Sequence, residues 1–92
     1  MPAVTFTIQL PDGATKQCYS PSTVVRHYFV TGEEMSVTEF LTRSHEALAA
    51  ASERVRARFG LTCSLASLQM AEIERWMSAV PGHSIVRIIS MR

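Results

Sequence analysis

The chain has 92 residues, of which 47% are hydrophobic and 18% charged, which is typical of one globular domain spanning residues 1–92. A net charge of +1 argues against a nucleic-acid partner. The longest strictly apolar run, Ala47 to Ala51, is far too short to cross a membrane. Two cysteines are too few for a disulfide scaffold, and the first residues lack a signal-peptide pattern, so we expect a cytoplasmic protein.

The first segment predicts a β-hairpin. Apolar and polar residues alternate from Val4 to Leu10, and Pro11-Asp12-Gly13 supplies the residues that a turn needs. The strand that returns over Thr15–Ser20 then pairs Phe6 with Cys18, because a turn of this type places Leu10 opposite Ala14. Directly paired residues share a face, so we expect Cys18 to point inward and Tyr19 outward.

The middle of the chain predicts helices. A short helical turn follows over Thr23–Phe29, with Ser20 or Ser22 as its cap, and residues 31–34 read as a loop. The capping box Ser36-Val37-Thr38-Glu39 begins a long helix that Gly60 ends in the left-handed conformation. A second helix is predicted over Ser64–Val80, and its apolar side comprises Leu65, Leu68, Ile73, Trp76, Met77 and Val80.

The last segment, Ser84–Met91, predicts a strand that is apolar on both faces and therefore lies beside the first strand. The expected fold is α+β: an N-terminal β-hairpin, a short helical turn, two packed helices, and a C-terminal strand that completes a small three-stranded sheet. The helices are expected on one face of this sheet, with Val86 and Ile88 pointing toward them.

The other face of the sheet predicts an interface. If Val86 and Ile88 point toward the helices, the uncovered face carries an apolar patch beside Arg87 that consists of Tyr19, Ile85, Ile89 and Met91. An exposed edge strand offers a second route to association. Either route predicts a homodimer.

The two cysteines have two interpretations. Cys63 precedes a predicted helix N-terminus, where a thiolate is favoured, so it could act as a nucleophile or a redox thiol together with Cys18. Alternatively, both are small buried hydrophobic residues. The three histidines and two cysteines show no metal-ligand spacing, so we expect neither metal nor cofactor.

Ser52, Glu53 and Arg54 begin the densest charge cluster of the chain. Arginines near the end of a helix interact favourably with its dipole, but the cluster could also contact an anion. Asp12, the one aspartate, is explained by the turn, so no Ser/His/Asp arrangement is expected. The candidate ligand or partner site comprises Cys18, Tyr19, Ser52, Glu53, Arg54 and Cys63.

Several short segments together resemble a family of small bacterial nitrogen starvation response proteins; these are Pro11-Asp12-Gly13, Cys18 to Ser22, Ala51 to Val55, Phe59-Gly60, Cys63-Ser64 and Ile73-Glu74. The resemblance implies a role near a nitrilase gene cluster, in scavenging nitrogen from nitriles or cyanide. The resemblance implies a cellular context, but it assigns neither a reaction nor a catalytic residue to this chain.

These observations favour a non-enzymatic, cytoplasmic accessory protein of a nitrogen-scavenging pathway, acting as a homodimer that binds a protein partner. The alternative is a small enzyme, or a small-molecule or redox binder, in which Cys18, Cys63, Ser52, Glu53 and Arg54 gather where the hairpin meets the helices.

Overall fold

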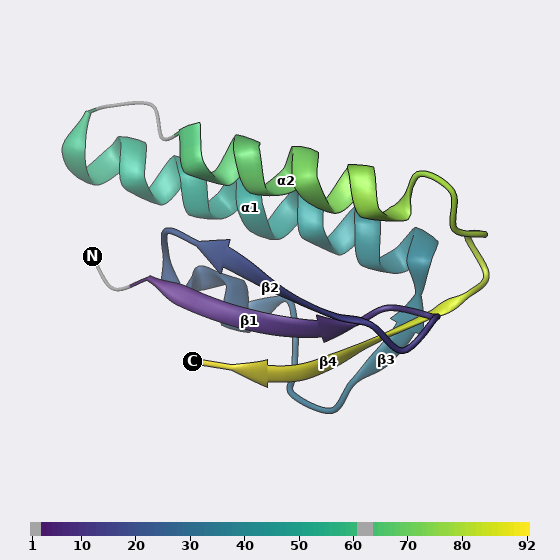
Figure 1. Cartoon of the computed structure of the whole chain (residues 1–92). Helices are drawn as coiled ribbons and strands as arrows, with labels where there is room; N and C mark the ends of the chain where they lie inside the picture. Colours follow the sequence, from purple (N-terminus) through teal and green to yellow (C-terminus); the bar gives the residue numbers. More distant parts are fainter. Residues whose placement is uncertain (1–2, 61–63) are drawn as a thin grey trace.

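The computed structural model describes residues 3–60 and 64–92 and has an α+β architecture, as predicted (Figure 1). Its elements in chain order are β1 (Val4–Gln9), β2 (Thr15–Ser20), the 3₁₀ helix η1 (Thr23–His27), β3 (Glu34–Ser36), α1 (Val37–Phe59), α2 (Ser64–Met77) and β4 (Ile85–Met91). Both α-helices lie on the same side of the sheet, so the domain has two layers.

The sheet has four antiparallel strands in the order β2-β1-β4-β3. The prediction that the last strand lies beside the first is confirmed, whereas the prediction of a three-stranded sheet is wrong. The additional strand, β3, pairs with β4 and buries Met35. Only three residues lie between Gly32 and the helix cap Ser36, and so short a segment cannot show the alternation of a strand. For this reason we predicted a loop there.

The hairpin register is the predicted one. Leu10 N–H donates to the carbonyl oxygen of Ala14 over 2.7 Å, and Phe6 pairs with Cys18 and Thr5 with Tyr19. The buried residues of β1 and β2 that face the helices are therefore Val4, Phe6, Ile8, Cys18 and Ser20, and the half-buried Lys16 lies on the same side.

A register shift between Thr7 and Ile8 changes the end of β4. Ile8 pairs with Ile88, but Thr7 pairs with Ser90 and Phe6 with Met91, so Ile89 is the extra residue of a bulge. Met91 consequently lies on the helix side and packs against the core. The prediction that Met91 belongs to the uncovered face is therefore wrong, since a bulge reverses the alternation and leaves no signal in the sequence.

Helix α1 begins and ends as predicted. The Ser36 hydroxyl accepts the Glu39 N–H over 3.1 Å, and Gly60 closes the helix at a φ of 71°. The last buried residue of α1 is Ala51, and Figure 1 shows the C-terminal end of the helix extending past the strands. We call Val37–Ala51 the anchored part of α1 and Ser52–Phe59 its projecting part.

Helix α2 ends at Met77, three residues before the predicted end, because Ser78 N–H and Val80 N–H bond three residues back instead of four. Its buried stripe is Ala66, Met70, Ile73 and Met77. Leu65 and Leu68, predicted on the apolar side, are exposed instead. Among the described residues, no helix has both the length and the apolar character needed to cross a bilayer.

The core lies between the sheet and the helices. Phe29 packs between Phe6 and Phe40, and its ring centroid lies 5.7 Å from that of Phe6 and 5.5 Å from that of Phe40. The predicted helical turn is η1, in which the Ser22 hydroxyl accepts the Val24 N–H and Val25 is buried. Val25 belongs to the core cluster, and η1 packs against α1.

Candidate functional site

Cys18 does not have the environment of a reactive thiol. It points into the core from β2 and is 1% exposed. Burial, with a smaller contribution from the nearby Glu72 carboxylate, raises its pKa to about 12. A thiol with this pKa is protonated at neutral pH and is a poor nucleophile and metal ligand. For Cys18, the interpretation as a small buried hydrophobic residue therefore holds; Cys63 lies outside the described residues.

Ser52 and Glu53 line an open groove between α1 and α2 with a volume of about 340 Å³. The groove has a floor of buried apolar side chains, and the full lining is His45, Leu48, Ala49, Ser52, Glu53, Arg56, Ala66, Ser67 and Met70. Small residues at the helix contact let the backbones approach, so the groove is shallow and open. An apolar floor with a polar rim suits a small amphipathic molecule or an apolar side chain.

The rim of the groove carries a histidine–carboxylate contact and an ion pair. His45 Nε2 lies 3.4 Å from a Glu74 carboxylate oxygen, and Arg56 donates to Glu53 over 2.9 Å. The Arg56 hydrogen bond lowers the pKa of Glu53, and its partner Glu53 raises the pKa of Arg56. Both pairs are exposed, so water and salt screen them and they contribute little to stability.

The predicted site residues do not gather in one place. Ser52 and Glu53 share the groove, whereas Arg54 is exposed outside it and Cys18 lies in the core. The described part of the chain also contains no group of three metal-ligating side chains. Sequence reasoning missed His45, Arg56 and Ser67 as groove residues, because only the crossing of two helices brings them together.

Tyr19 lies on the outer strand of the sheet, where the helix layer partly protects the edge. Its backbone N–H donates to Gln69 Oε1 over 2.8 Å, and Lys16 on the same strand lies 5.6 Å from the Trp76 ring centroid. A capped N–H and an inward charge both discourage pairing with another strand.

The uncovered face of the sheet is more polar than predicted. Ile85 and Ile89 are exposed, at 49% and 39%, but the register places on the same face Thr5, Thr7, Gln9, Thr15, Gln17, Tyr19 and Arg87. The expected contiguous apolar patch is therefore a face of hydroxyl and amide groups with two exposed isoleucines. This correction follows from the threonines and glutamines that alternate with the core residues of β1 and β2.

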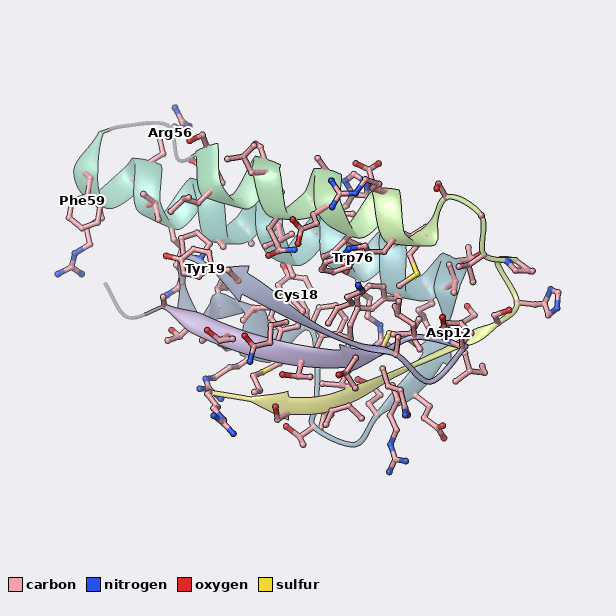
Figure 2. The ribbon with its side chains drawn as sticks, in the orientation of Figure 1. Asp12, Cys18, Tyr19, Arg56, Phe59 and Trp76 are labelled. Atoms are coloured by element: carbon pink, nitrogen blue, oxygen red, sulfur yellow. The ribbon has the colours of Figure 1, made fainter. Side chains whose placement is uncertain are left out.

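Three large apolar side chains are exposed where the helical hairpin closes: Phe59, Leu65 and Leu68. We call them the hairpin end. Figure 2 shows Phe59 at the extremity of α1, away from the sheet. Ala66, Met70, Ile73 and Met77 form the buried stripe of α2, and Leu65 and Leu68 fall outside it.

The fold and these surfaces define a small two-layer α+β domain. The model of the family described as nitrogen starvation-induced protein NitG matches residues 5–91, so the chain belongs to this family. The predicted resemblance to nitrogen starvation response proteins is thereby confirmed. A search of curated proteins and a search of solved structures each found no match.

Proposed function

We propose that the protein is a non-catalytic, cytoplasmic accessory protein of the response to nitrogen starvation, in a nitrogen-scavenging pathway. It acts as a homodimer that binds a protein partner. Membership of a nitrogen starvation-induced family supports the context. The buried Cys18 thiol and its separation from Ser52 and Glu53 argue against the catalytic alternative at these residues.

The proposed binding of a protein partner is supported by the composition of the uncovered face of the sheet. Protein interfaces are depleted of charged residues at their centre and enriched in aromatic side chains and arginine. On β1 and β2 this face consists of uncharged threonine and glutamine side chains with Tyr19, beside the exposed Ile85 and Ile89. On these two strands the face can donate and accept many hydrogen bonds, and its charged side chains, Arg87 and Glu34, lie on β4 and β3.

The test is capture of partners from nitrogen-starved cells, followed by reconstitution from purified components. We expect one protein to be enriched, and to bind the purified chain directly. The Ile85→Ser/Ile89→Ser variant should bind at least tenfold more weakly because it removes both exposed apolar anchors. Undiminished binding by that variant would reject the sheet face, and failure of every captured protein to bind directly would reject the proposal.

A second candidate function is binding of a small molecule in the α1–α2 groove, favoured by its volume and apolar floor. This function needs neither cysteine. Chemical-shift changes confined to Leu48, Ser52 and Met70 on addition of a metabolite mixture from starved cells would support it, and shifts elsewhere would not.

A further inference from the structure

We infer that Gln69 is an autoinhibitory cap on the open edge of the sheet. Its side chain occupies the place on β2 at which a second copy of this chain would otherwise add its own β2 strand. The inference goes beyond the proposed function and does not depend on the proposed homodimer, because it concerns a contact that the intact chain prevents.

Strand β2 is the longer free edge of the sheet. It lies outermost in the order β2-β1-β4-β3, and the opposite edge, β3, has only three residues. The Tyr19 N–H points away from β1, since it donates to a side chain of α2. Backbone groups alternate in direction along a strand, so those of Thr15 and Gln17 point outward as well. Outward N–H and C=O groups at every second residue form a template for another strand.

The occupant that fits this edge is a second β2. Antiparallel pairing about a two-fold axis at Gln17 brings Thr15 of each copy opposite Tyr19 of the other. Residues whose outward groups lie directly opposite exchange both N–H···O bonds. The strand is therefore complementary to itself, and the pairing uses the Tyr19 N–H twice, once at each end.

Gln69 blocks both ends of this pairing. Its Oε1 accepts the Tyr19 N–H over 2.8 Å, which removes that donor in each copy. The Nε2 of the same side chain is buried and has no acceptor within residues 3–60 and 64–92. A buried donor without an acceptor lowers stability. We therefore attribute the amide at this position to the capping role of its oxygen.

A second contact from α2 lies further along the same edge. Lys16 Nζ lies 5.6 Å from the Trp76 ring centroid, so this charge is held on the helix side of β2. Three strand residues from Lys16 to Tyr19 and seven helix residues from Gln69 to Trp76 each span about 10 Å. The two contacts are therefore aligned, and α2 covers the edge from Lys16 to Tyr19.

The experiment is sedimentation velocity of the full chain and two variants, from about 10 µM to about 1 mM, because strand addition buries less than the roughly 1,600 Å² of a standard interface. Gln69→Ala removes the cap. Gln69→Glu is the matched control, since a carboxylate keeps an acceptor on a side chain of the same length. Gln69 is only half-buried, so both variants should fold, which circular dichroism verifies.

We expect Gln69→Ala to self-associate about tenfold or more strongly than the wild type, and Gln69→Glu to behave like the wild type. An alanine variant that associates no more strongly than the wild type, or a glutamate variant that associates as strongly as the alanine variant, would overturn the inference. The size of the wild type tests the proposed homodimer separately. Loss of the cap should join wild-type dimers into larger assemblies, or wild-type monomers into dimers.

Amide hydrogen exchange of Tyr19, followed by NMR, shows whether the contact lies on this edge. The Tyr19 amide should exchange slowly in the wild type and faster in Gln69→Ala at low concentration. It should become protected again in Gln69→Ala at high concentration, because the β2 strand of a second copy then accepts its hydrogen bond. Equal exchange of the wild type and the alanine variant at low concentration would show that Gln69 does not cap this N–H, and would overturn the inference.

Discussion

The two parts of α1 belong to one continuous helix but meet different surroundings. The buried residues of α1 all lie in the anchored part; they are Val37, Phe40, Ser44, Ala47, Leu48 and Ala51. In the projecting part Ser52 and Val55 are half-buried and the other residues are exposed. Buried packing therefore stabilises the anchored part, whereas the side chains of the projecting part add little to the free energy of folding.

The largest expected difference is between two phenylalanines. Phe29, 2% exposed, packs between Phe6 and Phe40 under the anchored part, whereas Phe59 is 55% exposed. Phe29→Ala should lower the free energy of unfolding by about 3–5 kcal/mol, and Phe59→Ala by less than about 0.5 kcal/mol. Urea unfolding at low protein concentration measures both, and equal losses would erase the distinction between the two parts.

The buried side can be tested separately through the Cys18 thiol. Its pKa is about 12 in the folded protein and near the ordinary 9.0 in the unfolded chain. The unfolded state therefore loses this proton first, and stability should fall as pH rises from about 9 toward 12. In a Cys63→Ser background, the free energy of unfolding of the Cys18→Ala variant should depend less on pH over the same range than that of the protein with Cys18.

Thiol reactivity gives an independent measure of Cys18. In the same background, a thiol reagent at pH 8 should react only after denaturant is added. Rapid reaction of the folded protein would show that the thiol is accessible and ionisable, and the catalytic alternative would regain support.

The beginning of the anchored part should respond moderately to loss of its cap. Ser36→Ala removes the acceptor of the Glu39 N–H, and it should cost about 1 kcal/mol of stability. Ser36→Asp is the matched control, because aspartate can accept the same hydrogen bond. Thermal unfolding distinguishes them, and identical losses in both variants would mean that the hydroxyl does not act as a cap.

The smallest effect is expected in the projecting part at Glu53. Its ion pair with Arg56 is fully exposed, and exposed pairs contribute little. Glu53→Gln should leave the melting temperature unchanged within error. A clear drop would show that the projecting part depends on its own side-chain contacts and that the two parts of α1 are less different than their burial indicates.

Much of the fold follows from local sequence signals. Alternation over Val4–Leu10 and the turn at Asp12-Gly13 gave the hairpin and its register, and Ser36 and Gly60 gave both ends of α1. Each of these signals is local, since a cap or a turn is specified by a few neighbouring residues. The strand β3 and the bulge at Ile89 depend on distant pairing partners and could not be predicted.

The candidate site was less predictable, because its residues come from separate elements. Ser52 and Glu53 were identified as candidates from the sequence, but their neighbours Ala66 and Met70 in the groove depend on how α2 crosses α1. Leu65 and Leu68 were assigned to the core because two apolar stripes overlap on α2. Only the rotation of the helix decides which stripe is buried, and packing against the sheet sets that rotation.

The most direct test of the difference between the two parts of α1 is hydrogen exchange followed by mass spectrometry. Amides in peptides from Val37–Ala51 should exchange slowly because this part packs on the core, whereas amides in Ser52–Phe59 should exchange much faster. Equal protection along the whole helix would contradict the account.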